Sequence, residues 1–226
     1  MDGKPFNEQT IAVLGGSGRE GKGLVYRWAG AGFRVIIGSR SLEKAQNAAA
    51  EVSSLVDGKG RIEGMSNTDA ASSGDIVVLT VPYSAHREIL ESVRTVLKGK
   101  ILVDVTVPLA PPAVTKVRMP PAGSAAQEAH EILGEDVEVC TAFQNISFEQ
   151  LLHPGSLDCE VLITGTSKEA RHQTLALVVA AGLVGWDAGA IENSIVVEGL
   201  TSVLIYINKQ YNSTHAGIRI TGAGLP

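Results

Sequence analysis

The chain has 226 residues, of which 44% are hydrophobic, so it can bury the core of one compact domain with at most a small extension. A formal net charge of −5 argues against a nucleic-acid-binding protein, because such a protein needs a basic surface for the phosphates. A membrane partner is not expected either, since glycine, polar or charged residues interrupt every apolar run well short of a spanning length.

The N-terminal stretch and the two cysteines indicate the cellular location of the protein. Residues 1–9 lack the apolar core of a signal peptide. Cys140 and Cys159 stand alone in apolar runs, with neither C-x-x-C nor metal-ligand spacing, which favours buried reduced thiols. We therefore expect a cytoplasmic protein that binds no metal ion.

Apolar strand-like runs alternate with helical stretches, which predicts an α/β fold: a Rossmann-type, doubly wound parallel sheet with a small C-terminal helical extension. The continuous β-branched run at 75–81 is typical of a strand buried on both faces. Residues 107–122 hold five of the nine prolines and are expected to form an irregular loop. The expected strands are 11–14, 34–37, 61–65, 75–81, 100–105, 137–142 and 160–164; the expected helices are 18–29, 42–55, 67–73, 84–97, 124–133 and 168–181.

The last part of the chain is expected to extend a dinucleotide-binding domain of residues 1–182. Within 183–226, a short extended piece at 183–187 precedes a helix from Ala190 to about Tyr211. Apolar residues occupy more of this helix's circumference than one contact surface would cover. We expect the helix to close the substrate pocket and to meet a second subunit in a homodimer.

A glycine-rich turn near the N-terminus predicts nucleotide binding. Gly16, Gly18 and Gly21 fit G-x-G-x-x-G, and Gly15, Gly18 and Gly21 fit a G-x-x-G-x-x-G variant equally well. The motif directly follows the first expected strand and opens the first expected helix, which is the context that dinucleotide binding requires. The free N–H groups and partial positive charge of that helix start suit a pyrophosphate.

The end of the second strand predicts NADP rather than NAD. An NAD-binding chain normally carries Asp or Glu there to hold the ribose 2′-hydroxyl. This chain has Gly38-Ser39-Arg40 instead, with Lys44 one turn into the next helix. A hydroxyl, a guanidinium and an ammonium group suit a 2′-phosphate.

Other candidate site residues follow the later strands, because ligands of open α/β sheets lie beyond the carboxyl ends of the strands. None of them forms a Tyr-x-x-x-Lys relay, a His/carboxylate pair or a G-x-S-x-G nucleophile, so we assign no catalytic acid or base. His86 is expected on a helix surface as a hydrogen-bonding side chain. Hydride transfer between two ring cofactors is compatible with such a site, since it needs mainly alignment and exclusion of water.

Five segments together resemble a known family. They are G-G-S-G-R-E-G-K-G-L, G-S-R with the following Lys44, T-V-P-Y-S-A-H, A-F-Q-N-I-S and E-G-L-T-S-V-L-I. In this order they resemble the NADPH-dependent coenzyme F420 reductases, also called F420H2:NADP oxidoreductases, over nearly the whole chain. The resemblance implies a homodimer and reversible hydride transfer between NADPH and the deazaflavin ring of F420. The family commonly has His at the position of Gln144.

The resemblance also implies roles for individual residues. Ser17, Ser39, Arg40 and Lys44 would hold NADP, Pro82 would border the nicotinamide, and Gln144, Asn145, Ile146, Leu200 and Thr201 would line the deazaflavin. The complete set expected to bind cofactor or co-substrate is Gly15, Gly16, Ser17, Gly18, Arg19, Gly21, Ser39, Arg40, Lys44, Thr80, Val81, Pro82, His86, Val105, Gln144, Asn145, Ile146, Leu200 and Thr201.

Two other functions remain open on the sequence. The same scaffold could reduce a flavin or a small imine or carbonyl, with Gln144 marking a different acceptor. A non-catalytic sensor that binds NADP(H) would also lack acid and base residues. All of these functions share a small-molecule partner, and none involves nucleic acid or a membrane.

Overall fold

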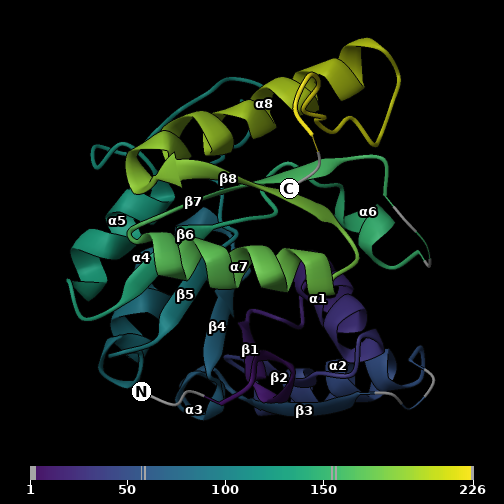
Figure 1. The fold of residues 1–226 in the computed structure, drawn as a ribbon, viewed down its shortest axis with the longest axis vertical. Coiled ribbons are helices and arrows are strands. Elements are labelled where there is room, and N and C mark those ends of the chain that lie inside the picture. Colours follow the sequence, from purple (N-terminus) through teal and green to yellow (C-terminus); the bar gives the residue numbers. More distant parts are fainter. Residues whose placement is uncertain (1–3, 57, 59, 154, 156, 225–226) are drawn as a thin grey trace.

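The strands form one sheet of eight in the order β3-β2-β1-β4-β5-β6-β7-β8, with helices on both faces (Figure 1). The computed structural model describes residues 4–56, 58, 60–153, 155 and 157–224. Residues 1–3 of the N-terminal stretch considered above lie outside this description. The strands are β1 Thr10–Leu14, β2 Arg34–Ser39, β3 Arg61–Ser66, β4 Ile76–Leu79, β5 Ile101–Asp104, β6 Glu138–Thr141, β7 Glu160–Gly165 and β8 Val184–Ala190.

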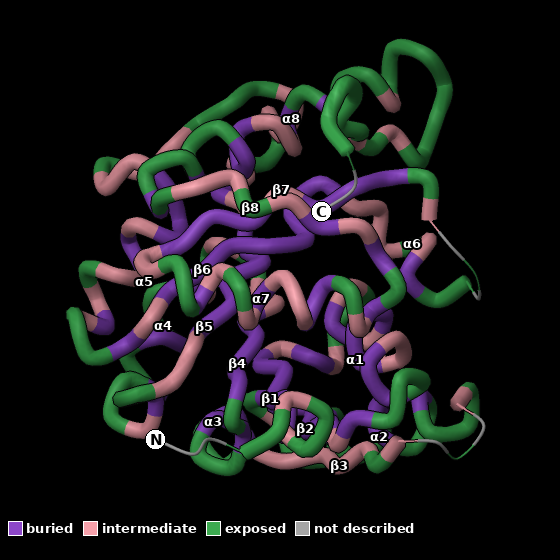
Figure 2. The backbone as a smooth tube through the Cα atoms, viewed as in Figure 1, coloured by how far each residue is buried: buried purple, intermediate pink, exposed green. Residues whose placement is uncertain are grey.

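The helices cover the sheet as two layers with separate apolar clusters. One cluster joins β1 and β2 to α1, α2 and α7, and includes the fully buried Trp28; the other joins β1, β4 and β5 to α3, α4 and α5. Figure 2 shows the central strands buried between these layers. The helices are α1 Arg19–Gly30, α2 Leu42–Ser53, α3 Asn67–Ser73, α4 Tyr83–Val93, α5 Ala125–Leu133, α6 Phe148–Leu151, α7 Lys168–Ala180 and α8 Ser194–Gln210.

The strand order reverses between β1 and β4, which confirms the doubly wound α/β fold. All neighbouring pairs are parallel except β6 and β7, where Thr141 pairs with Thr164 in the antiparallel sense. The sheet is therefore mostly parallel, and this pair is the one departure among the described strands from the parallel sheet expected from the sequence. The described residues of the connection between these strands form the short α6 and no long crossover helix, and antiparallel neighbours do not need one.

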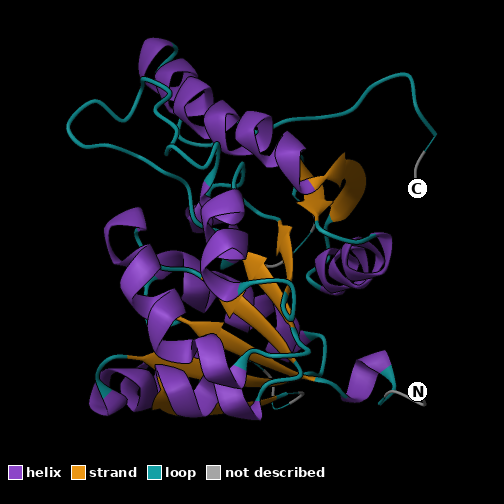
Figure 3. Cartoon of the chain, turned by 90° about the vertical axis from the view of Figure 1, so that its left-hand side faces the viewer, coloured by secondary structure: helices purple, strands orange, loops and turns teal. Residues whose placement is uncertain are grey.

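The C-terminal part also differs from expectation at its start. The extended piece is the edge strand β8, which pairs in parallel with β7 and reaches Ala190. A 3-10 turn over Ile191–Asn193 follows, so the helix starts at Ser194 and not at Ala190. The turn is supported by Asn193, whose Nδ2 donates to the carbonyl oxygen of Ala188 at 2.7 Å. Helix α8 then crosses the end of the sheet where the strands finish (Figures 1 and 3).

Among the described residues we looked for a membrane-spanning helix and for a cluster of metal ligands. No described helix combines the length and hydropathy that a membrane crossing requires. Nor do the described residues bring together three or more His, Cys, Asp or Glu side chains in a way that could hold a metal ion.

Candidate functional site

The turn between β1 and α1 brings backbone close to backbone. Gly15 has φ +73°, and a Cβ there would lie 2.7 Å from Val81 Cγ1. A Cβ at Gly21 would lie 2.6 Å from the Cα of Gly16. Because only glycine fits, helix α1 starts directly against the sheet, and Gly18 at its N-cap has no side chain to occupy the helix N–H groups. This turn is therefore built to accept an anion.

One pocket of about 250 Å³ lies on the β2 side of this turn, and we call it the Ser39 pocket. Arg40 and Lys44 lie at its exposed edge, and neither forms an ion pair with another described residue. No Asp or Glu is among the described residues that line it. Free cations without a neighbouring acid fit a phosphate better than a bare ribose hydroxyl. The lining residues are Gly15, Ser17, Gly18, Ser39, Arg40, Ser41, Lys44, Asn67, Thr80, Val81, Pro82, Ala85 and Ile89.

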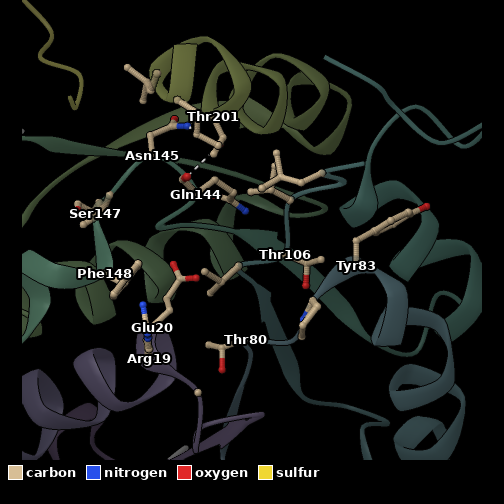
Figure 4. A pocket seen from close by; sticks show the side chains of 18 of the residues that line it. Arg19, Glu20, Thr80, Tyr83, Thr106, Gln144, Asn145, Ser147, Phe148 and Thr201 are labelled. Atoms are coloured by element: carbon tan, nitrogen blue, oxygen red, sulfur yellow. Dashed lines mark hydrogen bonds between the residues drawn. The ribbon is translucent and has the colours of Figure 1, made fainter. Parts of the chain in front are cut away.

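A larger cavity of about 540 Å³ lies on the other side of the turn, and we call it the Gln144 pocket. Figure 4 shows side chains entering it from α1, from the ends of β4 and β5, from the loop after β6 and from α8. Its volume suits a ligand the size of a planar tricycle. The lining residues are Gly18, Arg19, Glu20, Thr80, Val81, Pro82, Tyr83, Val105, Thr106, Val107, Leu109, Gln144, Asn145, Ile146, Ser147, Phe148, Thr201, Leu204, Ile205, Asn208, Thr214 and Ala216.

The loop after β6 is fastened to α8 by side chains. Asn145 Nδ2 donates to the carbonyl oxygen of Val197 at 3.0 Å and to Thr201 Oγ1 at 3.1 Å. Thr201 Oγ1 donates in turn to the Gln144 carbonyl at 2.9 Å, the contact drawn dashed in Figure 4. Phe143, which opens the loop, has φ +73°, and its buried ring packs edge-on against Trp28. The loop is thus held in an uncommon conformation by contacts on both sides.

Gln144 lines the cavity and has one buried acceptor without a partner. Its Nε2 donates to the carbonyl oxygen of Asp104 at 2.7 Å, which fixes the orientation of the amide. Its buried Oε1 has no partner among the described residues, and a buried acceptor without a donor costs about 1–3 kcal/mol.

His86 differs from expectation in both place and partner. It is fully buried, not on a helix surface, and its Nε2 lies 2.6 Å from Asp104 Oδ2. The expected absence of a His/carboxylate pair is therefore wrong. Burial by itself lowers the pKa of His86, but the carboxylate of Asp104 and more distant acids more than offset this, so the pKa is raised. The pair lies behind the cavity wall, not in it.

Two further buried acids were not predicted from the sequence. Glu198 on α8 accepts hydrogen bonds from the backbone N–H groups of Ala125 at 2.7 Å and Ala126 at 3.1 Å, at the start of α5. Burial raises the pKa of Glu198 to about 8, and these hydrogen bonds offset part of the effect. Glu128 accepts a hydrogen bond from the Tyr83 hydroxyl at 2.5 Å, and burial together with this contact raises the pKa of Tyr83. An acid inside an apolar helical run, as in I-V-V-E-G-L, was the available signal for Glu198.

Most of the expected site residues line one of the two pockets. Four of them do not. Gly16 and Gly21 contact each other within the turn, His86 is buried behind the wall of the Gln144 pocket, and Leu200 also lies outside both linings. Leu200 was expected to line the deazaflavin together with Thr201, but it is not among the residues that line the Gln144 pocket. On α8 the cavity-facing row is Thr201, Leu204, Ile205 and Asn208, at i, i+3, i+4 and i+7, and Leu200 lies about 100° away from that row.

Other lining residues were missed in the sequence. Glu20 and Phe148 are the most consequential, since they bring a carboxyl group and an aromatic ring to the lining of the Gln144 pocket. Arg19, which was predicted, stacks its guanidinium 5.5 Å from the centre of the Phe148 ring. Phe148 belongs to α6, a helix too short to show an apolar period in the sequence.

Known proteins are similar to this chain in sequence over nearly their whole length. Residues 10–108 match the family described as NADP oxidoreductase coenzyme F420-dependent. The chain is 38% identical over 221 residues to an F420-dependent NADP reductase of Methanocaldococcus jannaschii, with 93% of this chain and 97% of the relative covered. It is 40% identical to the F420-dependent NADP reductase of Methanothermobacter thermautotrophicus, covering 93% of this chain and 94% of that one.

The fold is also found in solved structures. A crystal structure from Arthrobacter sp. FB24 superposes with a TM-score of 0.78 at 24% identity, covering 94% of this chain and 99% of that one. A reductive aminase from Aspergillus terreus in complex with NADPH gives a TM-score of 0.63 at 12% identity, covering 90% of this chain and 61% of that one. These two likenesses concern the fold. By its full-length similarity to the two archaeal reductases, this chain belongs to the family of F420-dependent NADP reductases.

Proposed function

We propose that this protein transfers a hydride between NADP(H) and coenzyme F420. The observation that carries the proposal is the pairing of two pockets across one glycine turn. The Ser39 pocket offers unpaired cations, the Gln144 pocket is large enough for a planar tricycle, and Gly18, Thr80, Val81 and Pro82 line both. A dinucleotide whose pyrophosphate lies at Gly18 would reach both pockets.

The residues of the chain would divide the work as follows. Ser39, Arg40 and Lys44 bind the 2′-phosphate, and the N–H groups at the start of α1 bind the pyrophosphate. Pro82 and Val105 border the nicotinamide, which supplies the hydride. Gln144, Ile146 and Thr201 orient the deazaflavin and exclude water.

A single absorbance assay tests this function. Purified protein with NADPH should bleach the absorbance of oxidised F420, and NADP should restore it from reduced F420. The same protein should show far lower rates with a flavin or with cyclic imines. Turnover of those substrates with no turnover of F420 would favour the reductase alternatives, and NADPH binding without any turnover would favour a sensor.

Coenzyme preference is expected to depend on Arg40. NADPH should bind at least tenfold more tightly than NADH, or about 1.4 kcal/mol, because the 2′-phosphate meets cations and no acid in the Ser39 pocket. Arg40→Ala should remove most of this preference, since the guanidinium can bind phosphate with two parallel hydrogen bonds. Dissociation constants from fluorescence titration measure both effects. Arg94→Ala serves as the control, because Arg94 is exposed but lies outside both pockets.

We also propose a homodimer that buries the outer face of α8. The apolar residues exposed on this face are Ile195, Val196, Val203, Tyr206 and Ile207. Five exposed apolar side chains on one side of a helix are unusual for a surface that faces only water. Light scattering should give twice the chain mass of 23.6 kDa at micromolar concentration. A Val196→Glu, Val203→Glu double variant should give the monomer mass, and a monomer in the unmutated protein would contradict the proposal.

The remaining assignments follow the same division of the chain. We assign NADP binding to residues 1–182, and closure of the Gln144 pocket together with subunit contact to residues 183–226. A cytoplasmic location is supported by Cys140 and Cys159, which are both buried free thiols.

A further inference from the structure

Glu20 places a carboxyl group inside the Gln144 pocket without a partner. It is the second residue of α1, and in Figure 4 its carboxyl group points from the helix into the cavity, toward the side that carries Gln144. No described residue forms a hydrogen bond or an ion pair with the Glu20 carboxyl group. Its neighbour Arg19 stacks on Phe148 instead. The carboxyl group is partly exposed to the cavity and is therefore free to contact a ligand there.

The position of Glu20 relative to the dinucleotide follows from the two pockets, and this step rests on the proposed function. With the 2′-phosphate in the Ser39 pocket and the pyrophosphate at Gly18, the nicotinamide half extends into the Gln144 pocket. Glu20 lines the Gln144 pocket and not the Ser39 pocket. It therefore lies on the redox side of the glycine turn, close to where the nicotinamide enters.

Few other charges act on this carboxyl group. The titratable residues among the described lining are Arg19, Glu20 and Tyr83, and Tyr83 is engaged with Glu128. His86 is paired with Asp104 behind the wall. Burial raises the pKa of Glu20 to about 8, which favours the protonated carboxyl group near neutral pH. The positive end of α1 acts in the opposite sense, toward the ionised form.

We propose that Glu20 holds a proton beside the uncharged reduced nicotinamide and releases it beside the cationic oxidised one. When the C–H bond of the reduced ring breaks, its hydride forms a new C–H bond on the deazaflavin. The proton leaves the Glu20 carboxyl group and, directly or through water, ends on the deazaflavin ring nitrogen that receives the electron pair. The acceptor thus gains a hydride and a proton, and the carboxylate left behind balances the new positive charge on the nicotinamide.

This assignment makes the two dinucleotides respond differently to pH. Ionised Glu20 favours NADP+, and its ionised fraction rises with pH, so NADP+ should bind more tightly as the pH rises, whereas NADPH should not. Between about pH 6 and pH 9 the ratio of the NADP+ to the NADPH dissociation constant should fall about tenfold, as a pKa lowered by about one unit predicts. The 2′-phosphate also titrates, but it is common to both ligands and cancels in the ratio.

The experiment is a fluorescence or calorimetric titration of both dinucleotides across this pH range, without F420. Glu20→Gln keeps the shape of the side chain and should make the ratio of the two dissociation constants constant with pH within about twofold. The control is Glu149→Gln, which removes an exposed acid of α6 that lies outside the pocket. In this control the ratio should change with pH as it does in the unmutated protein. Calorimetry in buffers of different ionisation enthalpy should detect proton release on NADP+ binding, and Glu20→Gln should abolish it.

The outcomes separate this inference from the function on which it rests. A pH-independent ratio in the unmutated protein, or an unchanged slope in Glu20→Gln, would overturn the role of Glu20 while leaving the hydride-transfer function intact. If neither dinucleotide bound, both the proposed site and the role of Glu20 would be refuted. The pH dependence of the ratio is measured in the unmutated protein, so the proposal can be tested even if Glu20→Gln folds poorly.

Discussion

Asp104→Ala should lower the free energy of unfolding by about 3–5 kcal/mol, because it removes one partner of a buried charge pair. The side chains of Asp104 and His86 are each only 1% exposed, and no other acid bonds to His86 among the described residues. The substitution also removes the acceptor for the Thr106 N–H, which donates to Asp104 Oδ1 at 2.9 Å. Urea denaturation followed by circular dichroism measures the change.

A matched control is the surface pair of Lys98 and Asp136, whose groups approach to 3.1 Å with both side chains about two-thirds exposed. Asp136→Ala should cost less than about 1 kcal/mol, because solvent screens such a pair. Equal losses for Asp104→Ala and Asp136→Ala would refute the claim that burial decides the effect.

The same pair predicts how stability depends on pH. The folded pKa of His86 is raised above the unfolded value of 6.5, so its contribution is fully present below that value. The contribution is lost as the pH rises through the folded pKa. In Asp104→Ala this loss should disappear, since the carboxylate that raises the pKa of His86 is gone.

Gly21→Ala should weaken NADPH binding at least tenfold, or by about 1.4 kcal/mol. The new methyl group would lie 2.6 Å from the Cα of Gly16 and 2.8 Å from Thr80 Oγ1. Since the first of these is backbone, the clash can be relieved only by moving α1 away from the turn. The helix N–H groups then move with it, and overpacking should also cost about 1–3 kcal/mol of stability.

Gly30→Ala is the control for this substitution. Gly30 ends the same helix, and a Cβ there would meet no atom within 4 Å. Its effect should be neutral or stabilising by up to about 1 kcal/mol, with NADPH affinity unchanged. If both alanine variants bound NADPH as tightly as the unmutated protein, close packing of the turn would not be needed for the site.

The parts of the fold that the sequence predicted well are those determined by local pattern. The run at 75–81 is continuous and β-branched, and it contains the central strand β4. The glycine turn has a spacing that few other structures require, and it lies where expected. The end of β2, with Ser39 followed by Arg40, lines a pocket with Lys44, as the missing acid indicated.

The parts that the sequence did not predict depend on contacts between distant segments. His86 and Asp104 are 18 residues apart, and only the adjacency of β4 and β5 brings them together. The antiparallel direction of β7 follows a connection whose described helix, α6, is too short to show a period in the sequence. The position of Leu200 outside the pocket lining was not predicted, because the helical row facing the cavity cannot be chosen from an apolar pattern that covers several sides of α8.

Helix α8 serves two surfaces at once, and this restricts how its length can vary during evolution. Thr201 and Leu204 face the Gln144 pocket, while Val196 and Val203 lie exposed on the outside. Inserting one residue before Thr201 would rotate everything after it by about 100° and carry the cavity row onto another side of the helix. Insertions and deletions should therefore be rare in α8 among related sequences and more frequent in the proline-rich loop at 107–122, where no helical register has to be kept.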